Sequence, residues 1–384
     1  MPNKPPYGLL LIAGNLTHQE NYARALAADP RCRLIGLTDE ADIPPRRAEL
    51  NRMLAEELGI PLLPDLAAAL ARDDVQIVSV CAEPERRGRI AAQCARAGKH
   101  LYIDKPLGTT VEEARHVVTA VNDARVTSHL FSLVHIPTAY RAKEIVESGR
   151  LGDLSAIHYE LMFAKGIAGT ADLTRPRQEK AVADRFTFVD SKRELFCVGW
   201  YPLIFFPWLT GRRVTSVYAT TSNYFFAEHQ NNNVEDFSCL LLELEGGLIA
   251  TVTCGRTGWS SHPSHGFHKI HLVGEADSVD LDAYEPRLEI HNDAPAWRQP
   301  AVGHPEDPMG FWSSTQTAGG VEPKTDWLPI QPAVADDAVS FLDCLQQGRP
   351  SDVPVALGAH AVEVILASYQ SAAQGQPVTI PLED

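Results

Sequence analysis

The feature that most constrains the fold of this chain is a regular alternation of short apolar runs with longer amphipathic segments. The first run, from Tyr7 to Ala13, carries no charge, as expected for a strand buried on both faces of a parallel sheet. Comparable runs follow at 34–37, 75–80 and 101–103, and helical patterns separate them through about residue 128. This order predicts an α/β fold, with a doubly wound parallel sheet of the Rossmann type.

The helices of this first part have recognisable ends. Helical patterns at 45–58 and 84–97 are followed by Gly59 and Gly98, which can adopt the left-handed conformation that ends a helix. Thr110 and Glu113 have the spacing of a capping box, so a further helix should begin there.

The chain changes character in its second part. Alternating strand patterns are expected at 154–163, 214–222, 235–245, 248–254 and 269–273, with turn residues such as Gly246 and Gly247 between them. A helix is expected at 138–148, and two more, 333–347 and 358–373, close the chain. With 384 residues, we expect two domains, 1–128 and 129–384, the second an α+β domain with a large, mostly antiparallel open sheet.

Composition excludes several classes of partner. The formal net charge of -15 at pH 7 disfavours nucleic acid and anionic membrane surfaces, although a helix N-terminus can still bind a phosphate locally. The seven cysteines are scattered and form no CxxC pair, which favours thiols in a reducing, cytoplasmic compartment. No apolar run is long enough to span a bilayer, and the apolar residues before Gly14 are expected to be the first strand instead of a signal peptide.

The most specific motif is Asp104-Lys105-Pro106, directly after the strand expected at 101–103. At the carboxyl edge of a parallel sheet, where α/β proteins bind ligands, the ammonium of Lys105 would point into the crevice. An isolated triplet of this kind is more often a surface lysine beside a turn proline, and here its position in the fold favours a role in proton chemistry.

Three segments resemble the glucose-fructose oxidoreductase, inositol dehydrogenase (Gfo/Idh/MocA) family. Residues 95–107, ARAGKHLYIDKPL, resemble its AGKHVxxEKPL signature with Asp in place of Glu. Residues 149–152 (GRLG) resemble its G-x-[IL]-G turn, and 199–202 (GWYP) with 208–211 (WLTG) resemble its G-x-[HY]…W-L-x-G segment. The resemblance implies a nicotinamide dinucleotide in the first domain, a substrate site and oligomerisation sheet in the second, and hydride exchange with a sugar or cyclitol alcohol.

The cofactor loop departs from the G-x-G-x-x-G pattern, because its three positions are Gly14, Leu16 and Gln19. Leu16 would crowd a pyrophosphate unless the loop opens, while side chains beside it could supply donors to a phosphate instead. The candidates for those donors are Asn15, Thr17 and His18.

Other positions complete the expected cofactor site. Asp39 lies where a carboxylate accepts hydrogen bonds from the adenosine ribose, which favours NAD over NADP. Arg46 and Arg47 could reach a phosphate, although solvated helix arginines are the commoner case. By the resemblance, Glu83-Pro84 should lie near the ribose or nicotinamide, with Asp104 and Lys105 beyond it.

The catalytic segment departs as well. Where dehydrogenases of this family read D-x-G-x-H-x-x-D, this chain has Cys197, Gly199, Tyr201 and Ile204. Tyr201 could act beside Lys105, because a nearby cation favours the phenolate. Trp200 is a candidate substrate contact, and an equally open alternative is that these aromatic residues simply fill the core.

Histidines supply further candidates. Those between His262 and His271 lie in a segment without cysteine or carboxylate at metal-ligand spacing, so we expect a substrate-side loop that includes His262, and no metal. His135 lies past the last strand of the first domain and is expected to contact the ligand.

Three hypotheses about function stay open at this point. The chain is a NAD-dependent oxidoreductase of a sugar-like small molecule, or it keeps NAD bound for a net non-redox sugar reaction such as glycoside cleavage or epimerisation. The third is a non-catalytic relative that has lost dinucleotide binding. We expect a homo-oligomer, and the sequence does not identify the substrate.

Overall fold

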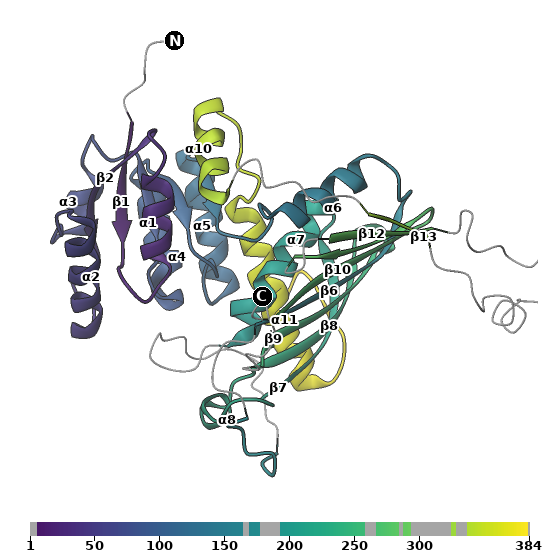
Figure 1. The fold of residues 1–384 in the computed structure, drawn as a ribbon. Helices are drawn as coiled ribbons and strands as arrows, with labels where there is room; N and C mark the ends of the chain where they lie inside the picture. The colour runs from purple at the N-terminus through teal and green to yellow at the C-terminus, as the bar shows by residue number, and fades with distance from the viewer. Residues whose placement is uncertain are drawn as a thin grey trace, which may run out of the picture.

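The computed structural model describes residues 6–163, 169–176, 193–257, 266–283, 287–292, 324–327 and 336–382 (Figure 1). A five-stranded parallel sheet has the order β2-β1-β3-β4-β5. Its strands are β1 (Tyr7–Ile12), β2 (Cys32–Thr38), β3 (Ile77–Val80), β4 (His100–Ile103) and β5 (Ser128–Leu130). The helices that alternate with them are α1 (Gln19–Ala27), α2 (Pro45–Leu58), α3 (Leu66–Leu70), α4 (Pro84–Arg96) and α5 (Val111–Ala124).

Both faces of this sheet are buried, as the uncharged strand patterns predict. Leu9 and Leu11 of β1 belong to one hydrophobic cluster, with side chains of α1 and α2, whereas Leu10 and Ile12 belong to another, with side chains of α4 and α5. Because neighbouring residues of a strand point to opposite faces, an apolar run places one layer of side chains on each side. The doubly wound prediction is confirmed.

Helix α10 (Asp337–Gln347) returns from the C-terminal part of the chain to this sheet (Figure 1). Its Ala338, Phe341 and Leu342 lie in the cluster that contains Leu9 and Tyr22. The first sheet is therefore covered partly by residues more than half the sequence away. The domain boundary at residue 128 remains a prediction.

The predicted helix ends are found. Gly59 caps α2 with a φ of 64°, and Gly98 follows α4 with a φ of 74°. Thr110 caps α5 by accepting a hydrogen bond from the backbone N–H of Glu113 at 3.1 Å. The Glu113 carboxylate accepts a hydrogen bond from the N–H of Thr109 at 3.0 Å. A standard capping box would use the N–H of the N-cap residue, Thr110, instead.

The second sheet has nine strands in the order β13-β12-β11-β10-β6-β9-β8-β7-β14. Its longer strands are β6 (Leu154–Phe163), β7 (Val214–Ser222), β8 (Phe237–Leu244), β9 (Ile249–Arg256) and β10 (Gly266–Gly274), and the others are β11 (Ser278–Asp282), β12 (Arg287–Asn292), β13 (Lys324–Trp327) and β14 (Val378–Thr379). The pairs are antiparallel except β6 with β9, which run parallel. The prediction of a mostly antiparallel sheet is confirmed.

Helices cover one face of the large sheet. They include the π-helix η1 (Leu195–Gly199), α7 (Trp200–Thr210) and α11 (Val355–Gln374), which also packs against α5 and so joins the two sheets. Helix α6 (Pro137–Glu147) packs against α7, and α8 (Ala227–Asn232) precedes β8.

On the opposite face of the large sheet, Tyr218, Leu241 and Phe267 are 40–48% exposed, so the described chain leaves this face open. None of the described helices combines the length and apolar character needed to cross a membrane.

Replacing Phe341 by alanine should destabilise the first domain, because the side chain is fully buried between α10 and the parallel sheet. A cavity of this kind costs about 3–5 kcal/mol of unfolding free energy. Urea denaturation followed by circular dichroism measures it. Leu173→Ala, at a position 80% exposed, is the control and should change stability by less than about 0.5 kcal/mol; equal effects of the two variants would contradict the placement of α10.

Candidate functional site

The Asp104-Lys105-Pro106 triplet follows β4 directly, at the carboxyl edge of the parallel sheet. The Asp104 carboxylate is buried and accepts three hydrogen bonds, from Arg87 Nη2 and the Tyr22 hydroxyl at 2.8 Å each and from His18 Nδ1 at 3.0 Å. Burial opposes ionisation of this carboxyl, but Arg87, His18 and Lys105 outweigh it and hold the pKa of Asp104 well below its ordinary value. Asp104 is therefore a permanent anion beside the catalytic candidate.

Lys105 and Tyr201 are brought together from the two halves of the chain. The Lys105 Nζ donates to the backbone carbonyl oxygen of Cys197 at 3.0 Å and lies 5.6 Å from the centroid of the Tyr201 ring. Both residues are less than a tenth exposed. At this depth an ammonium acts on a neighbouring phenol with little screening by water.

The turn that presents the Cys197 carbonyl is a π-helix. A π-helical carbonyl accepts from the residue five positions on, and for Cys197 that residue is Pro202, which has no N–H. Pro202 therefore cannot donate to this carbonyl, and the Lys105 ammonium does.

The other predicted substrate residues lie in different surroundings. Trp200 is fully buried, and its Nε1 donates to the carbonyl of Phe131 at 3.4 Å. His135 is also buried, with Nδ1 2.8 Å from the Tyr140 hydroxyl, and burial lowers the pKa of its imidazole. His262 lies outside the described residues. Their roles toward a substrate remain predictions.

The predicted phosphate-binding loop, from Gly14 to Gln19, has a glycine at one of its three motif positions. A Cβ on Gly14 would lie 2.6 Å from the carbonyl oxygen of Leu50, so only glycine fits there. Leu16 has a φ of 61°, the left-handed conformation that a glycine would supply, and its side chain is 56% exposed. Gln19 is buried, and its amide oxygen accepts from Ser79 Oγ at 2.7 Å. The Leu16 side chain thus projects toward solvent, and its effect on a bound pyrophosphate remains a prediction.

The predicted phosphate donors are already engaged within the loop. The Thr17 hydroxyl donates to the Gly14 carbonyl at 2.8 Å, and the carbonyl of Asn15 accepts from Arg47 Nη1 at 2.8 Å. Arg47 is fully buried, which corrects the expectation of a solvated helix arginine, whereas Arg46 is exposed. Arg47 braces the loop from α2.

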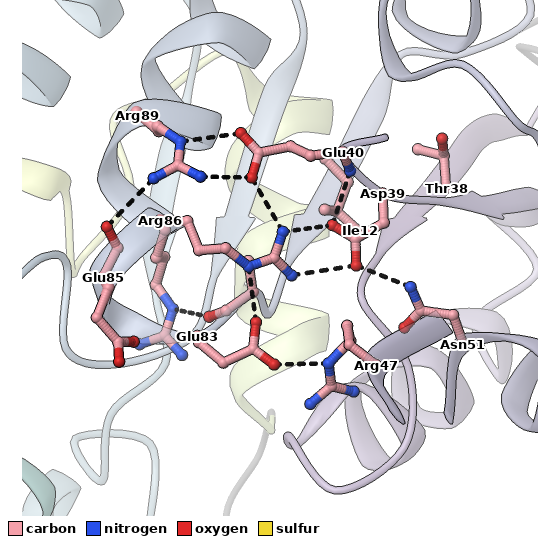
Figure 2. Close-up of polar contacts among 12 residues, drawn as sticks. Ile12, Thr38, Asp39, Glu40, Arg47, Asn51, Glu83, Glu85, Arg86 and Arg89 are labelled. Carbon is pink, nitrogen blue, oxygen red and sulfur yellow. Dashed lines mark hydrogen bonds and ion pairs between the residues drawn. The ribbon is translucent and has the colours of Figure 1, made fainter. Parts of the chain in front are cut away.

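Asp39 lies at the end of β2, as predicted, but protein donors saturate its carboxylate (Figure 2). One oxygen accepts from the Glu40 N–H at 2.8 Å and Arg86 Nη1 at 2.7 Å. The other accepts from Asn51 Nδ2 at 2.7 Å and Arg86 Nη2 at 3.1 Å. These four hydrogen bonds use the lone pairs that a ribose would need.

Glu83 and Pro84 begin α4 and complete this network. The Glu83 carboxylate lies between Arg47 Nε at 2.6 Å and Arg86 Nε at 2.7 Å (Figure 2). Burial opposes its ionisation, but the two arginines outweigh burial and lower the pKa of Glu83. Pro84 occupies the first helical position, where its missing N–H costs nothing.

The sequence interpretation did not identify two further groups of charged residues. Arg86 and Arg87 lie in the first turns of α4, where the helix dipole disfavours a cation, and that position could have signalled carboxylate partners. Glu194 directly precedes η1, and its buried carboxylate accepts from Arg256 Nε at 2.8 Å, with His229 Nε2 at 3.5 Å. It supplies a carboxylate near the turn where Cys197 stands in place of the family's aspartate.

The site fits a dinucleotide with one condition. The glycine cradle at Gly14 and the left-handed Leu16 provide the loop, and Asp39, directly after β2, is the carboxylate predicted to receive ribose hydroxyls. Because Arg86 occupies both oxygens of Asp39, ribose recognition requires Arg86 to move away from at least one of them. The residues that would hold the cofactor are therefore present and initially paired with one another.

Sequence comparisons agree with this geometry. Residues 11–131 match the oxidoreductase family with an NAD-binding Rossmann fold, and residues 140–280 match the GFO/IDH/MocA C-terminal domain. An inositol 2-dehydrogenase of Pseudomonas savastanoi pv. phaseolicola is 30% identical over 27% of this chain and 31% of its own length. A levoglucosan dehydrogenase of Pseudarthrobacter phenanthrenivorans is 31% identical over 21% of this chain and 20% of its own. The alignments span less than a third of these relatives.

Solved structures share the whole fold. A levoglucosan dehydrogenase in complex with NADH and levoglucosan has a TM-score of 0.71 at 17% identity, over 98% of this chain and all of the other. GenD2 from gentamicin A biosynthesis, in complex with NAD, has a TM-score of 0.69 at 21% identity, over 100% and 99%. At these identities the likeness shows the fold alone.

The pairing of Arg86 with Asp39 makes a prediction about cofactor choice. Arg86→Met should free the Asp39 carboxylate, strengthen NAD several-fold and weaken NADP, because a cation near a 2′-phosphate is lost. Asp39→Ala should do the reverse and narrow the gap between NAD and NADP. Fluorescence titration with both dinucleotides measures the four affinities.

Arg89→Met is the matched control, because Arg89 pairs with Glu40 and is bonded to neither oxygen of Asp39 in the structure. It should leave the ratio of NAD to NADP affinity nearly unchanged. An unmodified protein that already prefers NADP would overturn the assignment of Asp39.

Proposed function

Since this chain belongs to the Gfo/Idh/MocA family of NAD-binding oxidoreductases, we propose that it is an NAD-dependent dehydrogenase or reductase of a sugar, glycoside or cyclitol. The observation that carries the proposal is the meeting of Lys105 with Tyr201, each from a different half of the chain. The names of the relatives support the substrate class, which comprises polyhydroxylated rings.

In this proposal the chain's own residues move the proton. A bound nicotinamide supplies the hydride acceptor for oxidation, or the donor for reduction. Tyr201 takes the proton of the substrate hydroxyl during oxidation and returns it during reduction. Lys105 favours the phenolate form of Tyr201 and is itself held by the Cys197 carbonyl.

How tightly NAD is held decides between the dehydrogenase and a net non-redox reaction such as epimerisation. Arg86 must leave Asp39 for the ribose to bind, so part of the binding free energy is used to break that pair, which favours exchangeable NAD. Mass spectrometry of the denatured protein should therefore find little NAD after gel filtration. Stoichiometric NAD surviving this step would favour the net non-redox reaction, and failure to bind added NAD would favour a non-catalytic relative.

Lys105→Met and Tyr201→Phe should each abolish most of the turnover, with the loss in kcat and little change in NAD affinity. The two residues act on one proton, so the double variant should cost little more than either single variant. Steady-state kinetics with a panel of sugars and cyclitols, together with NAD titration, provides the measurement.

Matched controls are Lys143→Met and Tyr218→Phe. Lys143 lies over the Trp208 ring and Tyr218 is 44% exposed on the open sheet face. Near-full activity of Tyr201→Phe, with loss of activity on substitution of His135 or His262, would move the acid/base role to histidine.

The open face of the large sheet is proposed as a subunit contact. It carries exposed apolar side chains and a hollow of about 480 Å³ whose lining includes His158, Lys269 and His271. None of the seven cysteines, which all lie in the described residues, forms a disulfide, and this supports a reducing compartment such as the cytoplasm.

Leu241→Glu should break this contact, because it puts a charge in the middle of the apolar face, where Leu241 is 48% exposed. Light scattering should show a dimer or tetramer of the unmodified protein and a smaller species for the variant. Met53→Glu, on the exposed side of α2, should leave the assembly unchanged. A monomeric unmodified protein at micromolar concentration would contradict the proposal.

A further inference from the structure

Three buried polar atoms converge at β5, an edge strand of the parallel sheet. They are His129 Nε2, His135 Nε2 and Asp337 Oδ1, and all three donor groups lie within 4.8 Å of one another. His129 is 0% and His135 5% exposed, and the Asp337 side chain is 11% exposed. None of the three atoms makes a hydrogen bond.

The remaining polar atoms of these side chains are each held by another residue. His129 Nδ1 lies 2.7 Å from Ser351 Oγ, and His135 Nδ1 lies 2.8 Å from the Tyr140 hydroxyl. The Tyr102 hydroxyl donates to Asp337 Oδ2 at 2.5 Å. Outer partners of this kind fix the imidazole orientation and tautomer, as they do around metal-binding histidines.

Direct pairing of the three groups does not account for the geometry. His129 Nε2 lies 3.1 Å from Asp337 Oδ2 without the geometry of a hydrogen bond, and His135 Nε2 lies 3.9 Å from Oδ1, which is too long for one. Buried polar atoms without partners are costly and uncommon. A cation between them would satisfy all three at once.

We propose that His129, His135 and Asp337 bind a divalent transition-metal ion, for which Zn²⁺ is the best match. Two imidazole nitrogens and one carboxylate oxygen are a common zinc donor set, with bond lengths of about 2.0–2.2 Å. To reach those lengths each donor has to move inward by less than about 1 Å. A water molecule would complete the coordination.

The position indicates a structural ion. His129 lies in β5, His135 lies between β5 and α6, and Asp337 begins α10, so the ion would fasten α10 to the first domain. Tyr102 stacks on His129 and contacts Tyr22, whose hydroxyl reaches Asp104. Two tyrosine rings therefore separate the proposed ion from the catalytic triplet.

The test uses the full chain without an affinity tag, stripped with a chelator and titrated with Co²⁺ and Zn²⁺. We expect about one ion per chain, a visible Co²⁺ absorption, and a melting temperature that rises with metal concentration. His135→Gln and Asp337→Asn should weaken binding more than a hundredfold and remove the thermal shift. Asp336, which caps α10, is untouched by the second change.

Tyr140→Phe removes only the hydroxyl that orients His135 and should weaken metal binding by about 10- to 100-fold. His271→Gln is the control, because His158 and His271 stack at the open sheet face, where histidines collect metal adventitiously. It should leave the affinity unchanged.

The proposal fails if the unmodified protein binds no stoichiometric metal, or if His135→Gln and Asp337→Asn bind it as tightly as the unmodified protein. Where those variants do not fold, zinc-edge anomalous diffraction from the unmodified protein decides. A peak between His129, His135 and Asp337 supports the site, and its absence there overturns it.

Discussion

The geometry of this site depends on the hydrogen bonds that the buried Asp104 carboxylate accepts. It binds Arg87 of α4, Tyr22 of α1 and His18 of the phosphate-binding loop, so one buried anion connects three segments of the first domain. Arg87 also donates to the carbonyls of Ala82 and Pro106, which fixes the backbone beside Lys105. Removing one partner of such a buried pair lowers the unfolding free energy by about 3–5 kcal/mol. Here it would also loosen the backbone that positions Lys105.

A second network supports the predicted phosphate-binding loop, in which two of the three motif glycines are replaced. Leu16 adopts the left-handed backbone conformation of the missing glycine, and its side chain is exposed. Gln19 is buried, and its amide oxygen accepts hydrogen bonds from Ser79 of β3 and from Cys81, directly after that strand. Arginines from α2 and α4 then brace the loop and the Asp39 carboxylate. A ligand that bound Asp39 would replace hydrogen bonds that Arg86 now makes, so its affinity would reflect the difference between the two sets of hydrogen bonds.

Much of the fold was predictable because periodicity is local. The strands 154–163 and 214–222, the helix 45–58 and the doubly wound sheet follow from apolar spacing and glycine stops. The meeting of Lys105 with Tyr201 was predictable only through the resemblance, because no local pattern relates residues so far apart. Arg86 on Asp39, Arg47 on Asn15 and the return of α10 were not predicted, since long-range pairing leaves little trace in a single sequence.

The return of α10 has a consequence for how the protein is made. Its Phe341 and Leu342 cover the same side of the sheet as Leu9 and Tyr22, which leave the ribosome more than three hundred residues earlier. Until then that hydrophobic surface stays incompletely covered on a nascent chain that already contains every strand of the first sheet. The hydrophobic core of the first domain is thus completed only after α10 has been synthesised, and chaperones can bind the exposed surface during that interval.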